Sequence, residues 1–228
     1  MCGRFSLTSP WKLLKERFAV EIPVNDYRLR YNAVPGQNLW VIPEETPYDA
    51  QLFKWGLVPF WAKDPKIGNR LINARAETIA EKPVFRTPLK KHRCLVLADG
   101  FYEWDKKGAK RVPYRVVMKD EHPFALAGIC DYWKDNKGNE LKSFSIITTD
   151  ANQLISKIHD RMPVILSRKD ETAWLDPDLD IIQALKMLRP YPAKEMKMYP
   201  VSTLVNNPKN DLPQVIKHER NETQTESL

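Results

Sequence analysis

The chain has 228 residues, of which 43% are hydrophobic and 10% aromatic, so one domain with a buried core is expected. Its net charge of +7 favours a polyanionic partner, and because the lysines and arginines are spread along the chain, any basic surface must be assembled by folding. Its apolar runs fall short of the ~20 residues that a membrane helix needs, which argues against a membrane-spanning protein.

The start of the chain and its cysteines bear on location. The first twenty residues lack the apolar stretch and small-residue cleavage site of a signal peptide, so a cytoplasmic location is expected. The three cysteines, Cys2, Cys94 and Cys130, are an odd and sparse set, which argues against a disulfide framework. Cys94 and Cys130 stand in apolar runs, where a buried thiol behaves as a small hydrophobic group.

The first part of the chain predicts one helix and two strands. Thr8-Ser9-Pro10 followed by WKLLKERF predicts an N-cap, a proline in the first turn and an amphipathic helix over residues 11–18. YNAVPGQNLWVI, residues 31–42, predicts a loop that leads into a strand, with Pro35-Gly36 as the turn. QLFKWGLVP, residues 51–59, is typical of a strand.

The middle of the chain is rich in strand signals. LINARAETI, residues 71–79, is ambiguous between strand and helix, whereas RCLVLADGFYEW, residues 93–104, predicts one strand that runs through Asp99-Gly100. Three more strands are predicted over residues 112–119, 124–133 and 143–149. Turn residues predict hairpin connections at 107–108, 120–123 and 136–139.

Helical signals return after residue 150. Asp150 is predicted to cap a short helix over residues 151–159, and Ser167 to begin a helical region after a strand at 163–167. The elements together predict a single α+β domain over residues 1–210, with a mainly antiparallel, partly closed β-sheet or barrel decorated by short helices. Residues 211–228 are predicted to form a polar tail.

Cys2 becomes the N-terminus if Met1 is removed, and an initiator methionine is usually trimmed when the next side chain is small. An α-amine of pKa ~7.7–8.0 would then stand beside a thiol of pKa ~8.5, so both nucleophiles are partly available at neutral pH. The amine can form an imine with an aldehyde, and the thiolate can close on the imine carbon to give a five-membered thiazolidine. Local sequence alone does not separate this role from an accidental cysteine.

Four polar residues in short motifs carry similar alternatives. Glu103 in ADGFYEW is either a strand-end surface residue or a general acid whose pKa is raised by aromatic neighbours. His159 in KIHDRMP is either a helix C-cap or an acid–base group. Asn73 and Arg75 in INARAET are either turn residues or a polar pair that enters a cleft.

Phe60 and Trp61 follow Pro59 at the end of a strand, where aromatics form either core or a surface on which nucleic-acid bases stack. The sequence has no CxxC or HxxxH, and its four histidines are scattered, so no metal site is expected. It also lacks a phosphate-binding glycine loop and a dinucleotide fingerprint, so no cofactor is expected.

Seven motifs in the same order resemble one family: MCGRF, YNAVPGQ, WGLVPFWAKD, INARAET, ADGFYEW, IHDRMP and YPVSTLVNN. This combination, which spans the chain from Cys2 to about Asn207, resembles the SOS response-associated peptidase (SRAP) family, the abasic-site processing proteins. The resemblance implies covalent capture of abasic sites in single-stranded DNA by a monomeric, reversible crosslinking protein, with strand cleavage by β-elimination as a side reaction and self-removal of Met1.

The resemblance also implies roles for residues. Cys2 would be the nucleophile, and Glu103 would protonate the sugar ring oxygen as the ring opens and assist reversal. Asn73 and His159 would position or polarise the sugar during imine formation. By the same resemblance, three arginines would clamp phosphates and three further residues would form an apolar wedge on the last base step: Arg4, Arg75 and Arg161, and Pro35, Phe60 and Trp61, respectively.

Two rival functions stay open. N-terminal-nucleophile glutamine amidotransferases also begin Met-Cys-Gly, but the similarity ends after these three residues and the motifs expected to hold glutamine are missing. A noncovalent single-stranded-DNA-binding module would leave Cys2 without a chemical role. Proteolysis of other proteins, which the family name suggests, has no support from any peptide-binding motif.

Overall fold

The computed structural model describes residues 2–105 and 111–219 and has an α+β fold, as predicted. Five strands form a closed barrel, because β10 pairs with β4 on one side and with β9 on the other. Going round, the strands are β4 (Gln51–Trp55), β3 (Asn38–Pro43), β6 (Arg93–Ala98), β9 (Phe124–Lys134) and β10 (Glu140–Asp150). All neighbours are antiparallel except β4 and β10, so the mainly antiparallel prediction holds.

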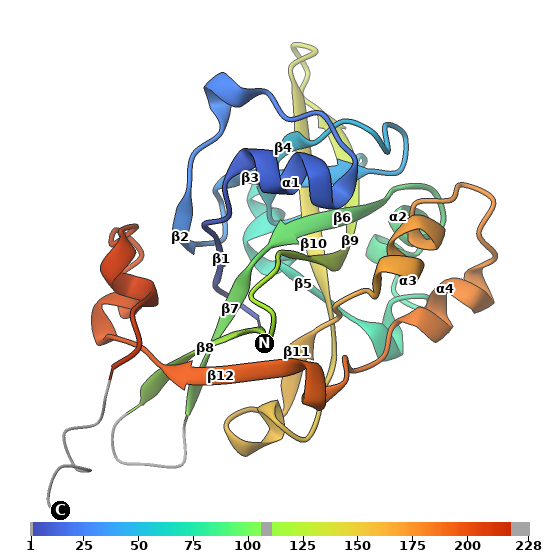
Figure 1. Ribbon diagram of the computed structural model, residues 1–228. Helices are drawn as coiled ribbons and strands as arrows, with labels where there is room; N and C mark the ends of the chain where they lie inside the picture. The colour runs from blue at the N-terminus through green and yellow to red at the C-terminus, as the bar shows by residue number, and fades with distance from the viewer. Residues whose placement is uncertain (1, 106–110, 220–228) are drawn as a thin grey trace, which may run out of the picture.

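The barrel separates two apolar cores because side chains alternate along each strand. On β3, Leu39 and Val41 point into the barrel, whereas Trp40 and Ile42 face the helices outside. Those helices are α1 (Trp11–Phe18), α2 (Pro83–Lys91), α3 (Arg168–Trp174) and α4 (Ile181–Met187), which surround the barrel in Figure 1.

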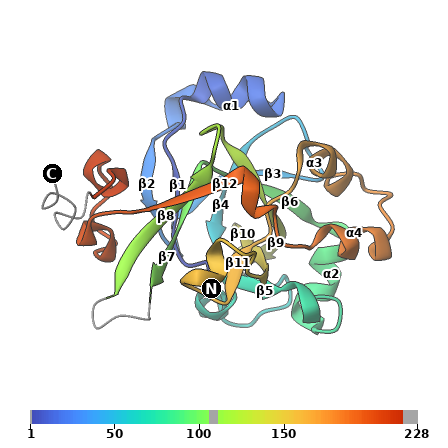
Figure 2. The ribbon, with the colours of Figure 1, turned by 60° about the horizontal axis from the view of Figure 1, so that its bottom comes forward.

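A second sheet packs beside the barrel. Its order is β12 (Met196–Pro200), β8 (Val112–Met118), β7 (Gly100–Asp105), β1 (Phe5–Leu7) and β2 (Arg30–Ala33), all antiparallel. Phe5 and Phe101 lie on its inner face, in the same apolar cluster as the barrel interior. The outer face is covered by two 3₁₀ turns, η6 (Thr203–Asn206) and η7 (Pro213–Ile216), seen in red in Figures 1 and 2.

Short elements complete the fold. Two strands extend the barrel sheet at β10, namely β5 (Asn73–Arg75) and β11 (Arg161–Pro163). The remaining 3₁₀ turns are η1 (Val24–Asp26), η2 (Pro65–Arg70), η3 (Ala76–Thr78), η4 (Ile155–Lys157) and η5 (Ala193–Glu195). Across the described part of the chain, no helix has the length and apolar character required to cross a membrane.

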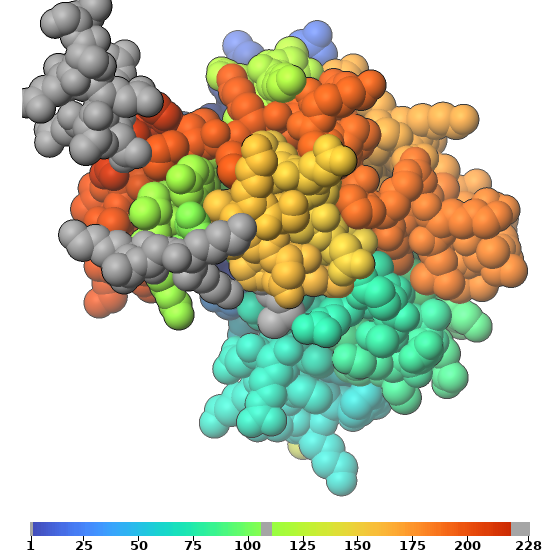
Figure 3. All heavy atoms as spheres, turned by 90° about the horizontal axis from the view of Figure 1, so that it is seen from below, coloured from blue at the N-terminus to red at the C-terminus, as the bar shows by residue number. Residues whose placement is uncertain are grey.

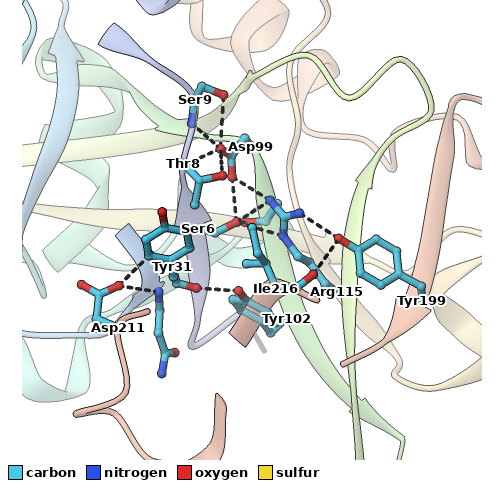
Figure 4. A network of polar contacts seen from close by, with 12 residues as sticks. Ser6, Thr8, Ser9, Tyr31, Asp99, Tyr102, Arg115, Tyr199, Asp211 and Ile216 are labelled. Carbon is cyan, nitrogen blue, oxygen red and sulfur yellow. Dashed lines mark hydrogen bonds and ion pairs between the residues drawn. The ribbon is translucent and has the colours of Figure 1, made fainter. Parts of the chain in front are cut away.

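The strand predicted through residues 93–104 is instead two strands in different sheets, with the break at Asp99. The Asp99 carboxylate accepts hydrogen bonds from the backbone N–H of Thr8 and of Ser9, and it pairs with the buried Arg115 at 3.0 Å (Figure 4). Arg115 also donates to Ser6 and Tyr199. This polar cluster fixes the place where the chain passes from the barrel to the second sheet.

The cluster explains a second correction. Thr8 and Ser9 do not cap α1: the residue at the N-cap is Pro10 and no side chain bonds there, because both hydroxyl groups bond to Asp99 instead. The helix itself has the predicted bounds.

The predicted connections have mixed outcomes. Residues 136–139 join β9 to β10 as a hairpin, as predicted. Residues 120–123 do not form a hairpin, because β8 and β9 belong to different sheets. The 107–108 turn lies outside the described residues, although the strands that it joins, β7 and β8, are paired.

The structure differs from the prediction just after residue 150 and has packed residues at the start of the predicted tail. The helix predicted over 151–159 is only the turn η4, and Asn152, not Asp150, accepts the backbone bonds that begin it. The predicted polar tail begins with packed residues: Asp211 accepts the backbone N–H of Asn32, and Val215 is fully buried. Asp211 and Val215 therefore pack against the second sheet, and the position of the domain boundary stays a prediction.

Candidate active site

The start of β1 brings Cys2 to β7. Phe5 pairs with Phe101, and the backbone N–H of Tyr102 donates to the carbonyl of Arg4 at 3.0 Å. Continuing this antiparallel register towards the N-terminus places Gly3 opposite Glu103. Cys2 is the next residue, and its thiol lies close enough to Glu103 to feel the charge of that carboxylate. The pairing of two short strands thus joins two motifs that lie a hundred positions apart in the sequence.

Asn73 holds the main chain of Cys2. It opens β5, which runs parallel to β10, and its side-chain N–H donates to the Cys2 carbonyl at 2.8 Å. The other side-chain atom of this amide, Oδ1, is buried and accepts no hydrogen bond from the residues that the structure describes. Asn73 therefore has one atom that holds Cys2 and one buried acceptor that makes no hydrogen bond within the described part of the chain.

Glu103 and His159 form a buried carboxylate–imidazole pair. His159 Nε2 lies 3.8 Å from Glu103 Oε2, and the two side chains are only 7% and 4% exposed. The backbone N–H of Arg161 donates to His159 Nδ1 at 3.0 Å, which leaves Nε2 as the protonated nitrogen of the neutral ring. Asp160 Oδ1 is also 3.0 Å from Nδ1, but its carboxylate is 87% exposed, so the backbone bond sets the tautomer.

The Cys2 thiol is fully buried, and its Sγ lies 3.8 Å from the carbonyl oxygen of Arg4. Burial raises the pKa of this thiol well above its ordinary value, and the negative charge of Glu103 raises the pKa further. The thiol is therefore protonated at neutral pH in this arrangement, and any reaction as thiolate needs a group that accepts its proton.

Arg4 is predicted to clamp a phosphate, and the structure places its guanidinium against the protein. It donates to Asn32 Oδ1 at 2.8 Å and to the carbonyls of Val205 and Asn206, and it lies over the Trp104 ring, 5.9 Å from the centroid. Arg4 thereby ties the start of the chain to η6. A phosphate contact would have to add to these bonds or replace them.

Arg75 and Arg161 differ in their surroundings. Arg75 is exposed at the end of β5. Arg161 is buried on β11, where it pairs with Glu77 and Asp150 at 2.7 and 2.8 Å and donates to the carbonyl of Thr148. Of the two, only Arg75 presents its charge to solvent.

The predicted wedge residues stand on two segments that are joined by a backbone hydrogen bond. Phe60 and Trp61 are 58% and 54% exposed in the 56–62 loop that follows β4. Pro35 is half-buried in the turn between β2 and β3, and the next residue, Gly36, donates to the carbonyl of Trp55 at 2.8 Å where this loop begins. Pro35 is thus tied to the base of the loop that carries both aromatics.

Sequence reasoning missed residues that act through these groups. Glu77 was not singled out, although it stands two positions after Arg75 in the same motif and neutralises Arg161. Asp131 and Trp133, which bond to the backbone of the loop that carries Phe60 and Trp61, were missed because they stand in a strand with an apolar pattern. No group of His, Cys, Asp and Glu side chains suited to a metal ion occurs among residues 2–105 and 111–219.

The barrel and the second sheet together hold the cysteine at position 2 beside a buried carboxylate and a histidine, which defines a protein with a candidate thiol site. The sequence model described as "SOS response associated peptidase (SRAP)" matches residues 1–208. The chain belongs to this family, and the assignment made from its motifs is confirmed.

Similar proteins agree with this assignment. The chain is 46% identical to "Abasic site processing protein YoqW" of Bacillus subtilis, over 95% of this chain and 99% of that protein. It is 38% identical to "Abasic site processing protein HMCES" of Gallus gallus over 72% of this chain, which spans 55% of that longer protein. A crystal structure of a protein from Bacteroides thetaiotaomicron has a TM-score of 0.88 at 32% identity, covering 96% of this chain and all of that one.

Proposed function

We propose that this protein processes abasic sites by capturing them covalently in single-stranded DNA through Cys2 after Met1 is removed. The observation that carries the proposal is that Asn73 holds the Cys2 backbone at 2.8 Å next to the buried Glu103–His159 pair. Its relatives, named abasic site processing proteins, support the same substrate. The protein would act as a monomer in the cytoplasm, without a metal or cofactor.

Once Met1 is removed, the chemistry would use the α-amine and thiol of Cys2 and the side chains beside them. An abasic deoxyribose opens to an aldehyde when its ring oxygen receives a proton, the bond from C1 to that oxygen breaks, and the C1 hydroxyl loses its proton. Glu103 is the nearby group that would donate the first proton and accept the second. The α-amine of Cys2 adds to the aldehyde carbon and loses water, giving an imine. The thiol then adds across this C=N bond: sulfur bonds to carbon, and the proton is transferred to nitrogen. The product is a thiazolidine.

Ring closure competes with strand cleavage. An imine at the sugar C1 can lose the 3′ phosphate by β-elimination, which would be a lyase activity. Addition of the thiol removes the imine and prevents this elimination, so the crosslink would shield the lesion. Reversal would follow the same steps backwards. Asn73 Oδ1, buried and without a partner among the described residues, can accept a hydrogen bond from the amine or from a sugar hydroxyl.

The test is a denaturing gel with single-stranded DNA that carries one abasic site. Wild type should give a slow band that survives denaturation. Cys2→Ala keeps the amine but has no thiol, so it should give no such band, more nicked strand, and an adduct only when borohydride reduces the imine. Cys130→Ala, which removes another buried thiol, should behave as wild type.

Mass spectrometry of the same samples shows whether Met1 is absent. If wild type lacks Met1 and yet forms no denaturation-resistant band, covalent capture is refuted. In that case, a Cys2→Ala variant that binds DNA as tightly as wild type would favour a noncovalent DNA-binding module, and hydrolysis of glutamine by the wild type would favour an amidotransferase.

A further inference from the structure

The 56–62 loop exposes two large aromatic side chains next to each other. Phe60 and Trp61 are both more than half exposed, although burial of such side chains in a core would be favourable. The loop has no helix or strand between the end of β4 and η2, and only the turn bond from Ala62 N–H to the Pro59 carbonyl, 2.9 Å, is internal to it. Its shape must therefore come from the surrounding structure.

Backbone contacts fix the beginning of the loop. Gly56 donates to the carbonyl of Phe144 on β10 at 2.8 Å, and Leu57 donates to Leu71 at 3.1 Å. Gly56 has a φ of +126° and packs against Gly68, so a Cβ there would lie 2.6 Å from the Gly68 oxygen. The left-handed conformation and the close approach both require glycine at this position.

Three side chains of the β9–β10 hairpin hold the rest of the loop. Ser143 Oγ accepts the Val58 N–H at 2.7 Å, and Asp131 Oδ2 accepts the Phe60 N–H at 3.1 Å. Trp133 Nε1–H donates to the Ala62 carbonyl at 2.7 Å. These bonds come at alternating loop residues.

Two of these three side chains are themselves held in place. Asp131 and Ser143 face each other in the β9–β10 register, and both are buried. The second oxygen of Asp131 accepts the Tyr132 N–H at 2.8 Å, so the carboxylate cannot rotate without losing a bond. A loop held from a rigid hairpin in this way is preorganised, which reduces the entropy lost when it binds.

We propose that Asp131 and Trp133, together with Ser143, are positioning residues that hold Phe60 and Trp61 ready to stack on a DNA base beside the abasic site. This inference rests on the proposed function. It assigns to the hairpin a role in recognising the flanking base, separate from the chemistry at Cys2.

The test places 2-aminopurine, a fluorescent base, next to the abasic site in the single strand. Stacking on an aromatic side chain should quench it in wild type. Asp131→Asn keeps the size of the side chain but only one acceptor oxygen, and Trp133→Phe removes the indole donor. Both should reduce quenching and weaken DNA binding by about five- to a hundredfold, the range that stacking on an aromatic contributes.

Two comparisons separate positioning from a general loss of structure. Phe60→Ala/Trp61→Ala should match the positioning variants, and Glu140→Ala, which removes an exposed carboxylate from the same hairpin, should match wild type. The reaction of Cys2 with a small aldehyde should keep its wild-type rate in all of them.

The outcomes are distinct from failure of the function itself. If wild type forms no crosslink, the proposed function fails. If wild type crosslinks, but Asp131→Asn and Trp133→Phe quench 2-aminopurine and bind DNA as wild type does, the positioning inference is overturned. Loss of the small-aldehyde reaction together with DNA binding would also overturn it, because the bonds would then support the whole site.

Discussion

At the scale of residues, the proposed reaction needs one group that donates a proton to the sugar and also one that accepts the proton of the Cys2 thiol, and a single carboxyl group could do both. The buried Cys2 thiol has a raised pKa and is protonated at neutral pH, whereas sugar ring opening needs a proton donor. Glu103 lies beside both Cys2 and His159. In the proposed function, the carboxyl would donate a proton to the sugar oxygen, and as carboxylate it would later relay the thiol proton to the thiazolidine nitrogen as that ring closes. The same group would reverse these transfers on release.

Glu103→Gln should therefore slow both formation of the crosslink and its reversal. The amide cannot carry the proton, and general acid–base catalysis contributes about 10²–10⁴-fold, so crosslinking and its reversal should slow by a factor in this range. Single-turnover gels measure capture, and exchange of a preformed crosslink with competing abasic DNA measures reversal. Glu140→Gln is the matched control on an exposed carboxylate. Wild-type rates in both assays would contradict the role.

The two arginines of the β5–β11 region should separate DNA affinity from stability. Arg75→Ala should leave the free energy of unfolding unchanged and reduce the salt slope of single-stranded-DNA binding by about 0.7, the contribution of one phosphate contact. Arg161→Ala should lower the free energy of unfolding by about 2 kcal/mol, because it removes charge-assisted bonds to Glu77 and Asp150. Urea unfolding and salt titrations measure the two quantities. The opposite pattern would make Arg161 the phosphate ligand.

The four side chains at the centre of the candidate site, Cys2, Asn73, Glu103 and His159, were singled out from short sequence motifs, and the structure brings them close together. Their chemical roles stay predictions, and the bond from Asn73 to the Cys2 carbonyl could not be foreseen from the motif. Their partners could not be predicted, since pairs such as Arg161 and Glu77 lie 84 positions apart and meet only through β10. The candidate reactive residues can be recognised from short motifs, whereas the residues that hold them in place come from distant parts of the sequence.

At the scale of elements, Asp99 decides how two strands become part of two sheets. An apolar pattern runs through residues 93–104 and predicts one strand, but a buried carboxylate must find donors. Thr8, Ser9 and Arg115 supply these donors, and the first strand ends just before Asp99. The barrel class and the helix at 11–18 were predictable from periodicity, whereas this break depended on contacts with the distant N-terminus.

Asp99→Ala should destabilise the fold strongly. It leaves the buried guanidinium of Arg115 without its carboxylate and frees the backbone N–H of Ser9, so the free energy of unfolding should fall by about 3–5 kcal/mol. The double variant Asp99→Ala/Arg115→Met should lose less than the sum of the single changes, because neither charge is then left unpaired. Strict additivity in urea unfolding would show that the pair is not coupled.

At the scale of the whole molecule, one segment of the chain has a marked excess of positive over negative side chains. Residues 61–91 contain eight lysines and arginines against three aspartates and glutamates, within a chain whose net charge is +7. All eight cations are exposed. Figure 3 shows this segment, in teal and green, beside the yellow segment near residue 155. The segment runs from Trp61 through Asn73 to α2, so basic side chains stand close in sequence to one predicted wedge residue and to one residue of the candidate site.

Charge on α2 should therefore act on DNA that extends beyond the lesion. Arg86 and Lys90 are one turn apart on its exposed face. Arg86→Ala/Lys90→Ala should weaken binding of a long single strand and reduce its salt slope by up to about 1.4, since each phosphate contact on a single strand contributes about 0.7. A strand ending near the abasic site should be little affected, because it does not reach α2.

The matched control removes two exposed lysines elsewhere, Lys12 on α1 and Lys137 in the β9–β10 turn. Figure 2 shows α1 on the opposite side of the molecule from α2 and β5. Because the net charge falls equally in both variants, a general effect of charge would lower affinity equally. A loss confined to the α2 variant and to the long strand would trace the DNA path over α2. Equal losses would exclude that path and leave only long-range attraction.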